Sequence, residues 1–181
     1  MVLTQMNSRH QWLIIDELVS DNMGIERFLK ESDTFMAQHY PTAMIAGDYC
    51  DPAGQSKHEH NDNTSFDYMM FHGLSPEAGD QSIDARLEAV RKPLNTMRDG
   101  EPGILVSPRC KMIRKGFNGG YRYRRMQVSG TRFTDKPDKN EYSHPMDALQ
   151  YVATRLFGRY SSDSGEDVIV TGGINEGCHI R

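Results

Sequence analysis

Short apolar runs alternate with segments of helical periodicity along most of this chain. The runs Trp12–Val19, Thr42–Cys50 and Gly103–Ser107 are brief and largely apolar, and the last two end in turn residues, so they predict buried strands. Between them, residues 23–39 and 83–94 carry apolar positions at helical spacing, with a cleaner period in the second segment. This alternation predicts an α/β fold with a mainly parallel sheet.

A helix predicted over residues 143–157 carries an acid near its start. Ser143 or His144 can cap it, and Pro145 is tolerated in the first turn, where its missing N–H costs nothing. Asp147 then falls near the third or fourth helical position. An acid there is most often only a carboxylate that the helix dipole favours, so any chemical role depends on the rest of the chain.

Residues 121–134 predict a basic β-hairpin, because two strand-like segments flank a Ser-Gly pair that suits a two-residue turn. The composition then changes, after the last helix, to a segment rich in Ser, Gly and Asp. We therefore expect one domain over residues 1–158 and a mobile C-terminal tail over residues 159–181. The tail contains one strand candidate, Asp167–Thr171.

Charge is segregated along the chain, although the net charge is only −4. Residues 109–139 hold ten basic and two acidic side chains, a net +8, and the other 150 residues carry eleven basic and 23 acidic ones. A basic segment on an acidic body predicts a polyanionic partner. No apolar run approaches the ~18 residues of a membrane helix. Three widely spaced cysteines, with no CxxC pair, fit a reducing cytoplasm better than a zinc site or a disulfide scaffold.

Two acids occupy positions that suit metal chemistry. Asp51 follows the strand predicted at Thr42–Cys50, and sites in such sheets form at the carboxyl ends of strands. Together with Asp147 it offers the oxygen ligands that Mg²⁺ or Mn²⁺ prefers, and such an ion can activate a water against a phosphodiester. With the basic hairpin holding phosphates, the residues predict a metal-dependent nuclease. Taken singly, the features also fit an ordinary turn, a helix start and a solvated surface.

Other polar residues are candidates for supporting roles. Glu17 ends a predicted strand and is a candidate auxiliary group. Asp48 lies three positions before Asp51, so in an extended strand it points to the opposite face, and we expect it to be structural. His144 can orient Asp147 or contact phosphate, or it can merely cap the helix. The candidates for DNA contact are Arg114, Lys115, Arg122, Arg124, Arg125, Arg132, Lys139 and Asn140.

Four motifs follow one another along the chain: Asp51-Pro52-Ala53-Gly54, Cys110-Lys111, Gly119-Gly120-Tyr121-Arg122 and Lys139-Asn140-Glu141-Tyr142-Ser143-His144-Pro145-Met146-Asp147-Ala148-Leu149-Gln150-Tyr151. In these motifs and their order, roughly residues 1–157 resemble the C-terminal nuclease domain of tailed-phage terminase large subunits. The resemblance implies an RNase H-like fold, a mixed sheet flanked by helices. It also implies Mg²⁺- or Mn²⁺-dependent endonuclease cleavage of concatemeric double-stranded DNA during packaging. Asp51 matches the second of three family acids, and Asp147 matches the third.

The same resemblance implies the setting of this activity. Its partners would be double-stranded DNA, the terminase ATPase segment, the small terminase subunit and the portal, with no membrane. The expected location is the cytoplasm of an infected or lysogenic bacterial host.

The family's first acid, which lies on an opening and central strand, has no counterpart here. No Asp or Glu precedes Asp16, and no GxxxxGK[ST] motif of an ATPase occurs. We therefore expect a fragment of a larger protein or of a split gene, with two unpaired sheet edges and no activity by itself. The alternative is a catalytically incomplete DNA-binding remnant. A resolvase- or transposase-like enzyme is a weaker third option.

Overall fold

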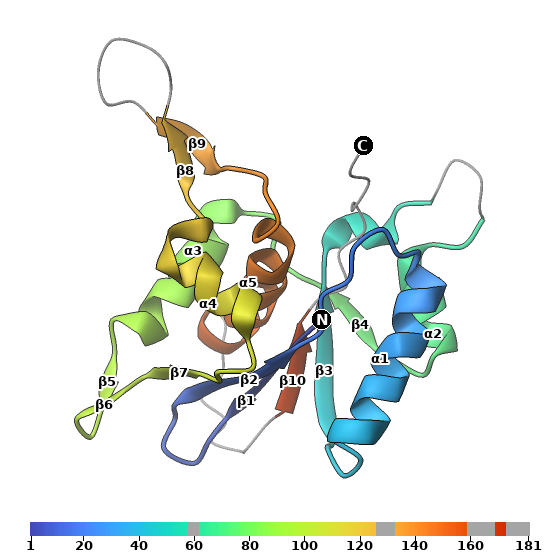
Figure 1. The fold of residues 1–181 in the computed structure, drawn as a ribbon, viewed down its shortest axis with the longest axis horizontal. Helices are drawn as coiled ribbons and strands as arrows, with labels where there is room; N and C mark the ends of the chain where they lie inside the picture. Colours follow the sequence, from blue (N-terminus) through green and yellow to red (C-terminus); the bar gives the residue numbers. More distant parts are fainter. Residues whose placement is uncertain (58–61, 126–132, 159–168, 173–181) are drawn as a thin grey trace.

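The apolar runs form strands of a six-stranded sheet, as their pattern predicts (Figure 1). The protein is represented by a computed structural model, which describes residues 1–57, 62–125, 133–158 and 169–172, the last segment by its backbone alone. In spatial order, the strands are β4 (Pro76–Ala78), β3 (Ile45–Cys50), β10 (Ile169–Gly172), β1 (Val2–Met6), β2 (Trp12–Glu17) and β7 (Ile104–Val106).

The sheet is mixed, with one reversed strand among strands that otherwise run parallel. β1 runs antiparallel to both of its neighbours, β10 and β2. The pairs β10–β3, β3–β4 and β2–β7 are parallel. The expectation of a mainly parallel sheet is confirmed for five of the six strands of this sheet, which point the same way. Strand β1 is reversed, because a short connection joins it to β2 and only an antiparallel pair allows that.

The C-terminal strand β10 lies inside the sheet, between β1 and β3. Its residues pair with β1 from Gln5↔Ile169 to Val2↔Gly172, and with β3 from Ile45↔Ile169 to Tyr49↔Gly172. The expectation of two unpaired sheet edges is therefore wrong, whereas the late strand candidate is confirmed in part. The predicted mobility of the tail concerns residues 159–168 and 173–181, which lie outside the described residues.

Helices cover both faces of the sheet (Figure 1). On one face lie α1 (Ile25–His39) and α2 (Ser65–Phe71), and on the other lie α3 (Ile83–Leu94), α4 (Lys111–Lys115) and α5 (Ser143–Phe157). The α5 face holds the larger core, where Trp12 packs edge-on against Phe157 with ring centroids 5.3 Å apart. A smaller core joins Leu29 of α1 and Cys50 of β3 to the apolar side of α2.

Side chains cap the starts of α2 and α3 by local rules, and the start of α5 is formed differently. Thr64 and Asp67 form a reciprocal capping box at α2, and Ser82 caps α3. α5 begins at Ser143 itself, after Tyr142, and no side chain caps it. The prediction of Ser143 or His144 as the cap is wrong, because the Ser143 hydroxyl accepts a hydrogen bond from the preceding loop instead. Asp147 is consequently the fifth helical residue.

Shorter elements complete the chain. The predicted basic hairpin is present as β8 (Tyr123–Arg125) and β9 (Phe133–Pro137), an antiparallel pair whose predicted Ser-Gly turn lies outside the described residues. It projects from the α3–α5 side of the molecule (Figure 1). The remaining elements are η1 (Pro52–Gln55), β5 (Met97–Arg98), β6 (Glu101–Pro102) and the π-helical turn η2 (Gly116–Gly120). Within the described ranges, no helix has the length and apolar character to cross a bilayer.

Candidate functional site

Strand β3 presents its acids to opposite faces of the sheet. Tyr49 belongs to the core beneath α5, whereas Cys50 packs with α1 and α2. Asp48 lies on the same face as Cys50 and accepts a hydrogen bond from the Ser75 N–H at 3.2 Å. The prediction that Asp48 points away from Asp51 is confirmed, because the Asp51 carboxylate acts on side chains of α5.

Asp51 has both a structural and an electrostatic role at the end of β3. Its Oδ1 accepts the Ala53 N–H at 2.9 Å and so caps η1, whose first residue is Pro52. Burial raises the pKa of Tyr151, and the Asp51 charge and a side-chain hydrogen bond to Asp51 raise it further. The turn that follows β3 therefore directs Asp51 toward the middle of α5.

Asp147 is a buried acid held by two cations. It is 6% exposed, its Oδ1 lies 3.6 Å from Nη2 of Arg86, and its Oδ2 lies 3.5 Å from Nζ of Lys139. The Arg86 guanidinium also stacks over the Tyr151 ring, 4.9 Å from its centroid. The cation–π contact thus joins Arg86, which pairs with Asp147, to Tyr151, which contacts Asp51.

Sequence reasoning missed Arg86, although a signal was present. Arg86 is three residues after Ile83 and four before Val90, so a charged residue interrupts the apolar face of α3. Its side chain is only 11% exposed. A buried cation on an apolar helix face needs an acidic partner, and the structure supplies Asp147 as that partner.

His144 lies under the influence of both acids. Burial lowers its pKa, the charge of Lys139 lowers it further, and the charges of Asp147 and Asp51 raise it. Its Nδ1 is buried and has no hydrogen-bond partner within the described part of the chain. Two acids that are 96 positions apart in sequence therefore both act on the pKa values of the same two α5 side chains, His144 and Tyr151.

Glu17 is engaged elsewhere. Its two carboxylate oxygens accept the N–H groups of Met112 and Ile113 at 2.5 and 2.9 Å, which caps the start of α4. The register Glu17↔Val2↔Gly172↔Tyr49 puts it three strands from Tyr49, or about 14 Å at the usual strand spacing. The structure gives Glu17 a capping role and does not bring it to Asp51 and Asp147.

Asp51 and Asp147 are two acids near α5 that could contribute ligands to a metal ion. In the described ranges, no three side chains of the His, Cys, Asp and Glu types cluster as metal ligands. Mg²⁺ is nevertheless commonly bound by one or two carboxylates, with water and substrate phosphates completing its shell. Asp51 and Asp147 can supply those carboxylates, provided that Lys139 releases Asp147.

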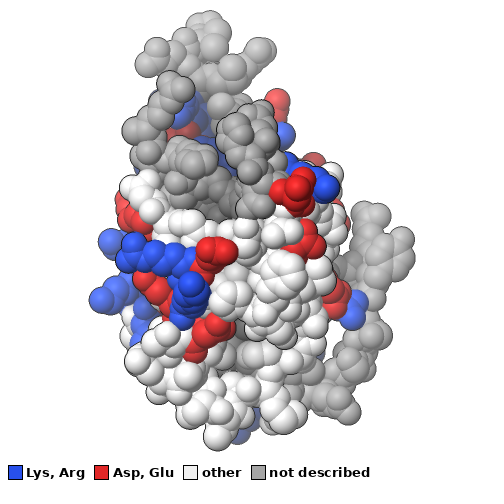
Figure 2. Space-filling model, turned by 90° about the vertical axis from the view of Figure 1, so that its right-hand side faces the viewer, with Lys and Arg blue, Asp and Glu red and all other residues white. Residues whose placement is uncertain are grey.

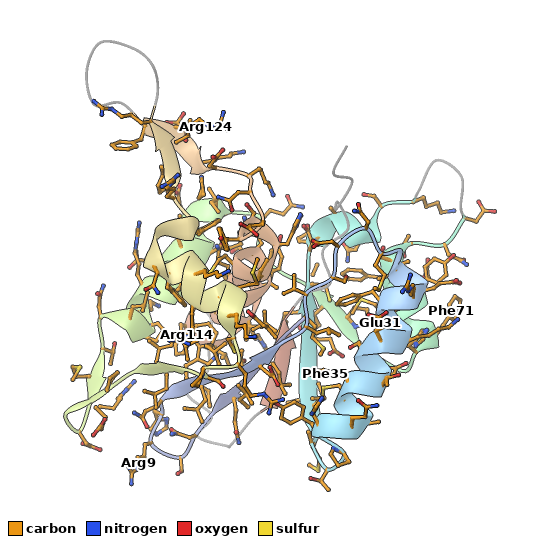
Figure 3. All side chains as sticks on the ribbon, in the orientation of Figure 1. Arg9, Glu31, Phe35, Phe71, Arg114 and Arg124 are labelled. Atoms are coloured by element: carbon orange, nitrogen blue, oxygen red, sulfur yellow. The ribbon has the colours of Figure 1, made fainter. Side chains whose placement is uncertain are left out.

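The basic residues form two separate groups rather than one surface. Arg114 and Lys115 are exposed on α4, close to the sheet, whereas Arg124 lies on the distant hairpin (Figure 3). Arg122 and Arg125 are exposed beside Arg124, and Arg132 lies outside the described residues. Arg109, from the same basic stretch, pairs with the buried Asp16 at 2.7 Å. The hairpin is therefore the part of the basic segment that projects furthest toward a partner.

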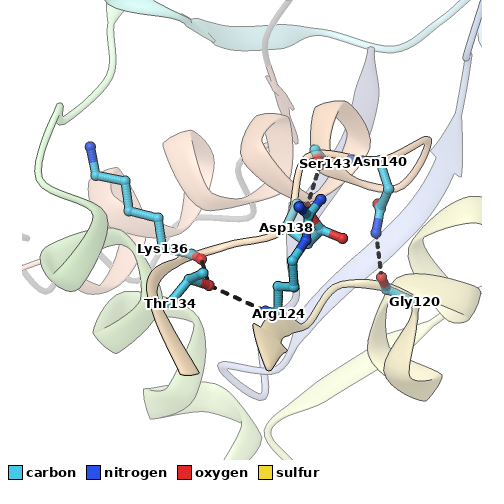
Figure 4. Close-up of polar contacts among 7 residues, drawn as sticks. All are labelled: Gly120, Arg124, Thr134, Lys136, Asp138, Asn140 and Ser143. Carbon is cyan, nitrogen blue, oxygen red and sulfur yellow. Dashed lines mark hydrogen bonds and ion pairs between the residues drawn. The ribbon is translucent and has the colours of Figure 1, made fainter. Parts of the chain in front are cut away.

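Asn140 is used within the protein. Its Nδ2 donates to the Gly120 carbonyl at 2.8 Å (Figure 4). Its Oδ1 accepts the Tyr142 N–H at 3.0 Å. The Nδ2 end of the amide thus ties the loop before α5 to the segment before β8, and the Oδ1 end holds the turn into α5. The predicted DNA contact by Asn140 stays a prediction, and the structure assigns this residue a fastening role.

The opposite side of the molecule shows no comparable arrangement. On the face with α1 and α2, basic and acidic side chains are interspersed (Figure 2). A cavity of about 280 Å³ lies between α1 and β3, lined mostly by apolar residues together with Ser32, Asp33, Tyr40 and Asp48. None of the predicted site residues lines this cavity.

Gly79 is required by the close approach of Tyr151. Its N–H donates to the Cys50 carbonyl at 2.8 Å, and a Cβ at this position would lie 2.2 Å from Cδ1 of Tyr151. We expect Gly79→Ala to displace Tyr151 and to lower the free energy of unfolding by about 2 kcal/mol, measured in urea. Gly24→Ala is the control, because nothing lies within 4 Å of its added methyl. Equal unfolding midpoints for the two variants would contradict the packing described.

Comparisons with protein-family models, with curated proteins and with solved structures found no match for this chain.

Proposed function

We propose that this chain is the metal-dependent endonuclease part of a viral DNA-packaging terminase, with an RNase H-like fold. The observation that carries the proposal is the convergence of Asp51 and Asp147. Both charges act on His144 and on Tyr151, beside the base of an exposed basic hairpin. Paired carboxylates next to cationic side chains suit the hydrolysis of a phosphodiester.

The position of β10 supports the fold part of this proposal. The terminase resemblance implies a central strand that carries the first acid, and in this sheet β10 takes a central place between β1 and β3. Because β10 runs parallel to β3, the sheet keeps a mixed arrangement around its centre.

In the proposed reaction, Asp51 and Asp147 would hold Mg²⁺ or Mn²⁺. The bound ion would activate a water and stabilise the charge on the leaving oxygen. Exposed hairpin arginines such as Arg122 and Arg125 would bind the DNA phosphates. The substrate would be concatemeric double-stranded DNA in the bacterial host cytoplasm, with the terminase ATPase segment, the small subunit and the portal as partners.

A second candidate function is a DNA-binding remnant without catalysis. The observation that favours it is the absence, among the described residues, of a third His, Cys, Asp or Glu ligand beside the two acids. In that case the hairpin would retain DNA while no strand is cut.

Incubation with supercoiled plasmid and Mn²⁺ tests the proposal. Because β10 fills the centre of the sheet, the proposal departs from the expectation of a fragment that is inactive by itself. We expect nicking by the unmodified chain, none in EDTA, and loss of nicking in Asp51→Asn. Asparagine caps a helix as well as aspartate does, so this variant keeps the η1 cap while removing the charge.

Asp84→Asn is the matched control, since Asp84 is an exposed acid in the first turn of α3. It is expected to nick like the unmodified chain. Plasmid retention with no cutting in Mn²⁺ would support the remnant instead. If the chain neither retains nor cuts the plasmid, both candidate functions are refuted.

A further inference from the structure

Three consecutive residues connect the basic hairpin to the buried acid. The carboxylate of Asp138 pairs with Arg124 of β8 at 2.6 Å. The backbone N–H of Asp138 donates to the Arg122 carbonyl at 2.8 Å. Asn140 fastens the same loop to Gly120, at the base of the hairpin (Figure 4). Lys139 lies between them and is the residue that reaches Asp147. The hairpin and Asp147 are thus joined through a loop in which each residue has a different partner.

The two cations on Asp147 differ in how firmly they are held. Arg86 is 11% exposed and is fixed by its stacking on Tyr151, whereas Lys139 is 78% exposed. An ion pair made by an exposed lysine is weak and exchanges easily, because water and salt compete for it. Lys139, on Oδ2 of Asp147, is therefore the cation that exchanges easily, and Arg86, on Oδ1, is the one that is firmly held.

A divalent ion and the Lys139 ammonium cannot share this oxygen without cost. Two cations within a few ångströms of each other repel strongly, most of all where protein limits the access of water. Lys139 also lies next to an exposed basic surface that suits a polyanion, so a DNA phosphate offers its ammonium another partner.

We propose that Lys139 couples DNA binding to metal binding: its ammonium occupies Asp147 in the absence of DNA and moves to a phosphate when DNA lies on the hairpin. This inference rests on the proposed function, and it adds a regulatory role for one residue of the same site. By linkage, DNA then strengthens metal binding, and the metal strengthens DNA binding by the same factor.

The test measures Mn²⁺ affinity by calorimetry on the full chain, with and without a short phosphorothioate duplex. Without DNA, Lys139→Gln is expected to bind Mn²⁺ about fivefold more tightly than the unmodified chain, or better still. Addition of the duplex is expected to tighten Mn²⁺ binding in the unmodified chain, and to do so much less in Lys139→Gln. Lys139→Arg, which keeps the charge, should behave more like the unmodified chain.

Lys136→Gln is the matched control, because Lys136 is an exposed lysine of β9 whose side chain points away from this loop (Figure 4). It should leave the Mn²⁺ affinity without DNA unchanged. If Lys139→Gln shows the same Mn²⁺ affinity and the same response to DNA as the unmodified chain, the coupling role is refuted.

A further variant separates this failure from that of the proposed function. Suppose that Asp147→Asn abolishes Mn²⁺ binding, while Lys139→Gln keeps the Mn²⁺ affinity and the DNA response of the unmodified chain. This result refutes the coupling alone and leaves the nuclease proposal standing. Absence of Mn²⁺ binding in the unmodified chain and in Lys139→Gln refutes both.

Discussion

A chain that ends at Gly158 is expected to lose most of its stability. Its truncation removes β10, which forms four register pairs with β1 and three with β3. At about 1 kcal/mol of net stability per backbone hydrogen bond, the loss of these ladders should lower the free energy of unfolding by about 4 kcal/mol. Two strands in the middle of the sheet would also become open edges, which favours aggregation. Urea unfolding and size-exclusion chromatography measure both effects.

Two further chains show whether β10 itself is responsible. A chain that ends at Gly172 keeps the strand and should unfold like the full chain. Val170→Pro, in the full chain, removes one backbone N–H from the middle of the sheet and should behave more like the chain that ends at Gly158. If truncation at Gly158 leaves the urea midpoint unchanged, β10 contributes nothing to the sheet and residues 159–181 behave as the tail that the composition predicts.

Asp147→Asn is expected to affect both nicking and folding. It removes one of the two proposed metal ligands, so nicking in Mn²⁺ should fall on the order of 100-fold. It also leaves the Arg86 guanidinium buried without its acid, and Nε of Arg86 already has no hydrogen-bond partner within the described part of the chain. An uncompensated buried charge should cost about 3 kcal/mol in the free energy of unfolding.

A double variant separates these two effects. Arg86→Met combined with Asp147→Asn removes the stranded charge and should recover at least about 1 kcal/mol relative to additive losses, while nicking stays low. Arg91→Met is the control on α3, because Arg91 is exposed and its pair with Glu88 should contribute about 0.5 kcal/mol or less. Strictly additive losses for Arg86 and Asp147 would show that the two side chains do not interact in solution.

Local pattern predicted most of the elements on which the site is built. The patterns of residues 42–50, 83–94 and 143–157 predict β3, α3 and α5, because periodicity depends on neighbours a few positions apart. The opposite directions of Asp48 and Asp51 follow from strand alternation alone. The N-cap predicted for α5 is wrong for a reason that is also local. The Ser143 hydroxyl bonds to Asp138 and Asn140 in the preceding loop and does not cap the helix.

Roles that depend on distant partners were not predictable in the same way. Glu17 reads as a free acid at a strand end, yet it caps a helix that begins 94 positions later. Asn140 reads as an exposed polar residue, yet its amide is used at both ends by the backbone. Arg86 breaks the apolar face of its helix, which signals a partner without naming it.

The sequence by itself determined the alternation of strands and helices and the basic hairpin, and it singled out Asp51 and Asp147 as candidate site residues. Only the tertiary structure decided that β10 enters the sheet between β1 and β3, that Arg86 and Lys139 share Asp147, and that Glu17 serves α4. The physical reason is range: periodicity and capping depend on neighbours within a few positions, so they can be read along the chain. Strand order and buried ion pairs depend on which distant segments the packed core brings together.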